Sequence, residues 1–180
     1  IKAMRKDGAE FIIVYPHWGL EYQMTEASWH REIAQKLCDM GVDAIIGGHP
    51  HVIEPVDVFT SEDGTHKTFC AFSLGNQLSN QRREMMRLKT GNTEDGLFID
   101  LEITRNKKGD VSLTGVKYIP TWVYKNASGP TYSIVPVDDP STVEEKTGIK
   151  GIQTQAQASY DRTYKIIGDG ANKVSEAYGF

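Results

Sequence analysis

Residues 11–46, FIIVYPHWGLEYQMTEASWHREIAQKLCDMGVDAII, have the pattern of a strand, a helix and a second strand. The two ends of this stretch, 11–15 and 42–46, are short apolar runs rich in β-branched residues, which favours strands buried on both faces of a parallel sheet. Between them, four apolar side chains recur at helical spacing, namely Trp29, Ile33, Leu37 and Met40. We expect Thr25 to cap this helix, Gly41 to end it, and a right-handed crossover to join two parallel strands.

The chain beyond this unit predicts further strands and then a helical C-terminal region. The expected strands cover residues 56–59, 68–73, 97–104 and 111–118. Residues 106–110 read as the turn of a hairpin between the last two strands, and residues 119–140, with four of the seven prolines, are predicted to run extended over the surface. From Val143 the chain is expected to be helical again. This order predicts an α/β fold, a mixed sheet with helices in a layered sandwich.

Composition restricts the class of protein. With 180 residues, 39% of them hydrophobic, the chain can form one domain with a substantial core. The 20 basic residues are outnumbered by 24 acidic ones, which argues against a dedicated nucleic-acid-binding protein. No run approaches the ~18 apolar residues of a membrane span. Cys38 and Cys70 lie in apolar runs and form no CxxC pair, so we predict buried free thiols, with a disulfide between them as the alternative.

Three histidines follow the two strands of the first unit. His17 comes directly after the first strand, and His49 and His51 come directly after the second. Since the carboxyl ends of parallel strands meet at one edge of a sheet, we expect these histidines to converge there. Neutral imidazoles are ligands for zinc, iron, manganese and similar ions. The preceding Gly47-Gly48 would let the backbone turn sharply and approach a ligand closely.

Four motifs resemble a known family, namely HWGLEY (17–22), GVDAIIGGHPHVIEPVDVF (41–59), SLGNQ (73–77) and YIPTWVYK (118–125). In this order they are similar to CapA-type proteins, the bacterial capsule and poly-γ-glutamate biosynthesis family, over residues 7–137. The resemblance implies a metallophosphatase-like fold, related to the calcineurin-like phosphoesterases, of which the chain would be the later part. Residues 1–140 would belong to that domain, and residues 141–180 would be a C-terminal helical extension of it.

The resemblance also implies a metal site. In the superfamily a lone histidine after a strand and a later Gly-His-x-His supply metal ligands, and the matching positions are His17, His49 and His51. The implied cofactor is a divalent ion, Mn, Fe or Zn, with two ions in the complete domain. The superfamily's Asp-x-His, Gly-Asp and Asn-His motifs lie upstream and are absent from these 180 residues. We therefore expect the chain alone to bind metal poorly and to catalyse little.

Three further residues of these motifs are site candidates. Glu21 is the candidate catalytic residue, which could orient a histidine or contact substrate, and its alternative is a surface carboxylate. Trp18 and Asn76 are candidate substrate-binding residues. The alternative for Trp18 is packing at the rim of the site, and for Asn76 it is shaping of the turn that contains it.

The remaining polar candidates are predicted to lie on the surface. His30 is expected on the exposed side of the helix, and His66 in a solvated turn. Arg82, Arg83 and Arg87 are expected to form a solvated face, with binding of a polyanion as the alternative.

Three functions agree with these features. The first is a metal-dependent phosphoesterase-like hydrolase or transferase that acts on a phosphoester or an anionic capsule polymer. The second is a non-catalytic component that binds the polymer and helps to export it. The third is a structural fragment with a degenerate site.

The implied setting is the outer face of a bacterial membrane, with an anchor that this chain lacks. Because the chain opens at Ile1 with what reads as the end of a helix, we expect an upstream segment, the N-terminal half of the domain, as its first partner. An exposed sheet edge would favour a homo-oligomer.

Overall fold

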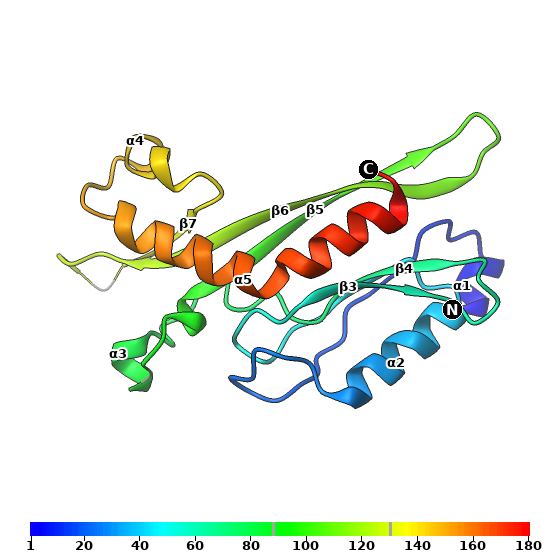
Figure 1. Ribbon diagram of the computed structural model, residues 1–180, viewed down its shortest axis with the longest axis horizontal. Helices are drawn as coiled ribbons and strands as arrows, with labels where there is room; N and C mark the ends of the chain where they lie inside the picture. The colour runs from blue at the N-terminus through cyan, green and yellow to red at the C-terminus, as the bar shows by residue number, and fades with distance from the viewer. Residues whose placement is uncertain (88, 130) are drawn as a thin grey trace.

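The computed structural model describes residues 1–87, 89–129 and 131–180, which form two β-sheets and a long C-terminal helix (Figure 1). The first sheet has four strands in the order β1-β2-β4-β3, and the second has three in the order β5-β6-β7. Helix α5 (Gln153–Tyr178) packs against β3 of the first sheet and β6 of the second, and α2 (Ser28–Asp39) covers the opposite face of the first sheet. The predicted α/β class with a mixed sheet is confirmed.

The four-stranded sheet contains the predicted strand-helix-strand unit. Strands β1 (Ile13–Val14) and β2 (Ala44–Ile46) pair in parallel on either side of α2 in the chain. Strand β4 (Lys67–Ala71) continues the sheet in parallel with β2, and β3 (Val56–Thr60) pairs with β4 in the antiparallel sense. The carboxyl ends of β1 and β2 therefore lie side by side.

The prediction that the first strand is buried on both faces is wrong. Strand β1 is at the edge of the sheet, and Ile13 is 47% exposed. The apolar run reflects β propensity, whereas burial depends on how many neighbours the strand finds, which is a property of the tertiary structure.

The predicted buried face of α2 is also wrong. Trp29 and Ile33 are exposed, whereas Ala34 and Cys38 lie against the sheet. Small side chains let the helix axis approach the strands closely. The buried stripe is therefore shifted by one residue from the stripe that carries the largest apolar side chains. Thr25 does not cap the helix, because the N-cap is Ala27.

The second sheet is longer than predicted. Strands β5 (Asp95–Arg105) and β6 (Val111–Lys125) form the predicted hairpin, and β7 (Tyr132–Pro136) pairs with the end of β6. The predicted extended surface segment at 119–140 is therefore wrong over most of its length. Its buried residues Trp122, Val135 and Val137 share one core cluster with Val143 of α4 and with Ile152 and Ala156 at the start of α5. Pro120 lies within β6, where it pairs with Leu97, and Pro136 ends β7. Pro130 lies outside the described residues.

The predicted helical C-terminal region is confirmed by α4 (Val143–Thr147) and α5. The remaining elements are short, namely α1 (Lys2–Lys6), α3 (Arg83–Met86), η1 (Asn92–Glu94) and η2 (Pro140–Thr142). Within the described ranges, none of the helices combines the length and the apolar character needed to cross a membrane.

Candidate metal centre

The loops that follow β1 and β2 are joined by backbone hydrogen bonds. His17 and Gly48 form a parallel bridge, in which Trp18 N donates to Gly48 O (3.0 Å) and Gly48 N donates to Pro16 O (3.1 Å). These bonds extend the sheet pairing by one step and bring His17 beside His49, with their ring centroids 4.5 Å apart. The structure thus brings together the histidines of two segments more than 30 residues apart.

Glu21, His49 and His51 form a group that could hold a metal ion. One ligand atom from each of the three side chains lies within 4.8 Å of those of the other two. Glu21 Oε1 is 3.9 Å from His51 Nε2, so the carboxylate faces the ring nitrogen that a metal would use. The sequence predicted His17, His49 and His51 as ligands and Glu21 as a catalytic residue. In the structure, the group of possible ligands contains Glu21 in place of His17, and His17 lies next to the group.

Asn76 determines which nitrogen of His51 is available. Its side-chain Oδ1 lies 3.1 Å from His51 Nδ1, and its Nδ2 donates to His51 O and to Thr93 O. Because Oδ1 can only accept, Nδ1 must carry the proton, which leaves the lone pair of Nε2 directed toward Glu21. Asn76 thus supports His51 from behind, as residues around metal ligands commonly do. Its predicted substrate contact stays a prediction.

The backbone at the site is strained. His49 has a φ of 113°, His51 of 60° and Tyr22 of 65°, all in a region that favours glycine. Each such residue costs about 1–3 kcal/mol, and strain of this kind is concentrated at functional sites. Tyr22 N donates to Pro50 O (2.7 Å), and the Tyr22 ring stacks on that of His51 with centroids 6.0 Å apart. Burial, and then the Glu21 carboxylate, raise the pKa of Tyr22.

Trp18 and His30 lie beneath the histidine loops. Trp18 is 6% exposed and donates from Nε1 to Phe72 O (2.9 Å), so it belongs to the core, and its predicted substrate contact stays a prediction. The predicted surface position of His30 is wrong, because its ring packs on Trp18 at 5.0 Å and its Nδ1 accepts from Ala27 N. Burial lowers the pKa of His30, which therefore stays neutral.

Residues 1–81 match the protein family described as "Bacterial capsule synthesis protein PGA_cap". Over these residues, the chain is similar to this family. It is 30% identical over 111 residues to the PGA biosynthesis protein CapA of Bacillus subtilis (strain 168), which covers 62% of this chain and 26% of the relative. It is 32% identical over 80 residues to the capsule biosynthesis protein CapA of Bacillus anthracis, which covers 44% of this chain and 18% of that relative. The chain thus spans about a quarter or less of the relatives it matches.

The segment that matches the family model, residues 1–81, contains a buried acid that the sequence motifs did not indicate. Glu54 is fully buried, and among the described residues neither of its carboxylate oxygens has a hydrogen-bond partner. Burial, with a smaller contribution from Glu26, raises the pKa of Glu54 to about 7. The available signal was a single acidic residue in the apolar run Val52-Ile53-Glu54-Pro55-Val56.

We expect Glu54→Gln to stabilise the protein at pH 8 by about 1–3 kcal/mol and to have little effect at pH 5. The folded pKa is above the unfolded value of about 4.3, so in the wild type the free energy of unfolding decreases as pH rises from about 4.3 through 7. Gln cannot ionise, and the variant should lose this decrease. Urea unfolding at both pH values measures the effect, and equal pH dependence in the two proteins would contradict it.

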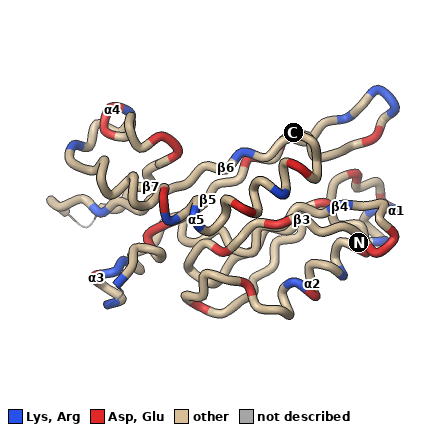
Figure 2. The backbone as a smooth tube through the Cα atoms, viewed as in Figure 1, with Lys and Arg blue, Asp and Glu red and all other residues tan. Residues whose placement is uncertain are grey.

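Two arginines just beyond residues 1–81, Arg82 and Arg83, form ion pairs with a buried glutamate. Arg83 Nε lies 2.9 Å from Glu94 Oε1, and Arg82 Nη2 lies 3.5 Å from Glu94 Oε2. Both compensate a fully buried carboxylate. The predicted solvated face is therefore wrong for Arg82, which is largely covered, whereas Arg83 is exposed as predicted. Figure 2 shows basic residues gathered at this end of the molecule, around α3. Arg87 is exposed, as predicted.

Two smaller predictions have opposite outcomes. His66 is not a solvated turn residue, because it is half-buried and its Nε2 lies 2.8 Å from Val42 O. The predicted buried free thiols of Cys38 and Cys70 are confirmed.

Proposed function

We propose that this chain is part of a capsule biosynthesis protein, acting on poly-γ-glutamate, with a metal-dependent hydrolase-type site on a metallophosphatase-like fold. The observation that carries the proposal is the group of Glu21, His49 and His51, with its strained histidine loop and the support of His51 by Asn76. The similarity to capsule biosynthesis proteins supports the biological role, and the site chemistry supports the reaction class.

The donor set fits a divalent ion. Two imidazoles and one carboxylate suit Zn or Fe, and the carboxylate also suits Mn. A bound ion would supply Lewis-acid polarisation of a phosphoryl or carbonyl oxygen of the substrate. Among the described residues, the group of three donors suits a single ion. His17, whose ring lies beside that of His49, is a further histidine next to this group. The second ion of a complete domain would need donors from the upstream segment that we expect as a partner.

The chain's own residues would prepare the site for this role. Asn76 holds His51 in the tautomer that leaves Nε2 unprotonated. His49 and His51 both have positive φ angles, and one ring nitrogen of each lies within 4.8 Å of a carboxylate oxygen of Glu21. Glu21 is exposed, so it can reach a ligand from solvent, and it would act on a proton of the substrate or complete the ion's coordination.

A second candidate is a non-catalytic component that binds the polymer and helps to export it. It is favoured by the small donor set, because a single ion with three ligands can fix an anionic chain without cleaving it. Both candidates place the protein at the outer face of the membrane. They differ in turnover, which the experiment below measures.

We expect the chain to bind about one Zn or Mn ion, with the low affinity that three donors provide. His49→Gly should weaken this binding by more than roughly 100-fold, the upper end of what loss of an outer-shell partner causes. Equilibrium dialysis followed by elemental analysis measures the stoichiometry. Glycine adopts the φ of 113° at this position without strain, so the variant should be at least as stable as the wild type. Loss of metal therefore could not be attributed to unfolding.

Phosphodiester and γ-glutamyl hydrolysis by the metal-loaded chain would distinguish the two candidates. Turnover that is lost in His49→Gly supports the hydrolase. Stoichiometric metal without turnover supports the polymer-binding component. Absence of metal from a folded wild-type chain would refute both, because each relies on the same ion.

A further inference from the structure

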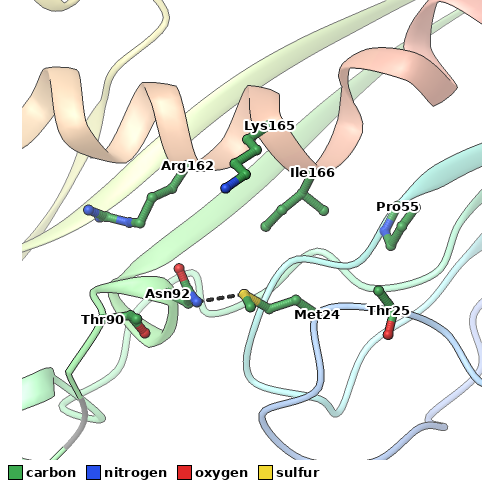
Figure 3. Close-up of a pocket in the computed structure, with 8 residues that line it drawn as sticks. All are labelled: Met24, Thr25, Pro55, Thr90, Asn92, Arg162, Lys165 and Ile166. Atoms are coloured by element: carbon green, nitrogen blue, oxygen red, sulfur yellow. Dashed lines mark hydrogen bonds between the residues drawn. The ribbon is translucent and has the colours of Figure 1, made fainter.

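A pocket lies between α5 and two loops (Figure 3). It has a volume of about 440 Å³. Its apolar wall comes from Met24, Pro55 and Ile166, and its polar wall from Asn92, Arg162 and Lys165. The pocket thus combines apolar surface with two basic side chains, which is suitable for a ligand with both an acidic group and a short apolar chain.

Two residues that line the pocket are close in the chain to residues that contact His51 or its partner Asn76. Met24 is two residues from Tyr22, whose ring stacks on His51. Asn92 precedes Thr93, whose carbonyl accepts from the Asn76 side chain that supports His51. A ligand held in the pocket would therefore lie next to the residues that position His51.

The charges of the pocket favour a single negative charge. Arg162 is already paired with Asp95 by two hydrogen bonds of 2.7 Å, so these two charges compensate each other. Lys165 makes no ion pair with any residue that the structure describes, and Figure 3 shows its amine directed from α5 into the gap above Asn92. The net charge of about +1 matches a carboxylate better than a phosphate dianion.

We infer that this pocket binds a carboxylate of an anionic polymer, through Lys165 and Asn92, and so anchors the chain beside the metal centre. The methylene groups that carry the carboxylate would contact Met24, Pro55 and Ile166. This subsite rests on the proposed function for the identity of its ligand, but carboxylate binding in the pocket does not itself require the metal.

The test is titration of the metal-free chain with a γ-linked glutamate tetramer, followed by isothermal calorimetry. We expect Lys165→Met to weaken binding by roughly tenfold or more, because a charge-assisted hydrogen bond is lost. The matched control is Lys173→Met, which removes the same charge from an exposed position of α5 outside the pocket. It should change the affinity by less than about twofold, since exposed charges are screened by salt.

Two outcomes would overturn the subsite. Equal effects of the Lys165 and Lys173 variants would show that the tetramer binds by general charge attraction. Inorganic phosphate that competes as well as the tetramer would show that the pocket selects phosphate. Metal content is measured in parallel, because failure of metal binding with a retained Lys165 effect would remove the proposed function and leave the pocket as a carboxylate site.

Discussion

Replacing Arg162 by Met is expected to lower the free energy of unfolding at pH 7 by about 3–5 kcal/mol, since it leaves a buried carboxylate without its counter-charge. The Asp95 side chain is 3% exposed, and both of its oxygens accept from Arg162 at 2.7 Å. Ser159 Oγ donates to the same carboxylate at 2.6 Å but carries no charge. Burial raises the pKa of Asp95 even with Arg162 in place, so in the variant this carboxyl would protonate more readily.

The destabilisation should therefore be smaller in acid, where Asp95 is neutral. Urea unfolding at pH 7 and pH 4.5 measures both effects. The double variant Asp95→Asn, Arg162→Met should recover much of the loss, because no buried charge remains. Lys165→Met, on the same helix, should differ from the wild type by less than about 0.5 kcal/mol. A single Arg162→Met variant as stable as this control would contradict the prediction.

The elements of the first sheet could be predicted from local sequence, but their surroundings could not. Apolar runs at 11–15 and 42–46 identify strands because β-branched residues suit a pleated backbone. The edge position of β1 depends on which strands pair with β2, and no residue of the run itself encodes that. In α2 the largest apolar residues suggested the buried face, whereas Ala34 and Cys38 permit a closer approach to the sheet. Periodicity predicts that the segment is a helix, whereas packing against the sheet determines which of its faces is buried.

In the segment 119–140, local sequence predicted less regular structure than the protein has. Its prolines suggested an irregular surface segment, but β6 continues to Lys125 and β7 pairs with it. Proline removes one backbone donor, and at a position whose hydrogen bonds are not needed this has little effect. Trp122 and Val135 were the contrary signal, because large apolar side chains in a proline-rich segment indicate that it covers a core.

The convergence of His17, His49 and His51 could be predicted, because they follow strands that were themselves predictable. The supporting residues were not. Asn76 lies 25 residues from His51, and its contact with the ring depends on the path of the intervening strands. Lys165 lies more than 100 residues from His51, and nothing in the sequence around it indicates that α5 returns to the site. A local motif can identify ligands, whereas the environment of the ligands is built by distant segments.

The return of α5 depends on Gly170, and Gly170→Ala is expected to lower the free energy of unfolding by more than about 3 kcal/mol, beyond the usual range for overpacking. A Cβ at this position would lie 1.7 Å from Val56 O and 2.7 Å from Val56 C. Both are backbone atoms of β3, so no side-chain rotation relieves the clash, and the helix must move away from the sheet.

Gly168→Ala is the matched control on the same helix. Among the described residues outside the local helix backbone, no atom lies within 4 Å of a Cβ placed at Gly168. Alanine has the higher helix propensity, so this variant should gain up to about 1 kcal/mol. Thermal and urea unfolding of the two variants should therefore shift in opposite directions.

Displacement of α5 would also remove Lys165 from its place above Asn92, so Gly170→Ala should lose tetramer binding even at temperatures where it stays folded. Equal stability of the two variants would show that α5 docks through its side chains and tolerates a greater distance from β3.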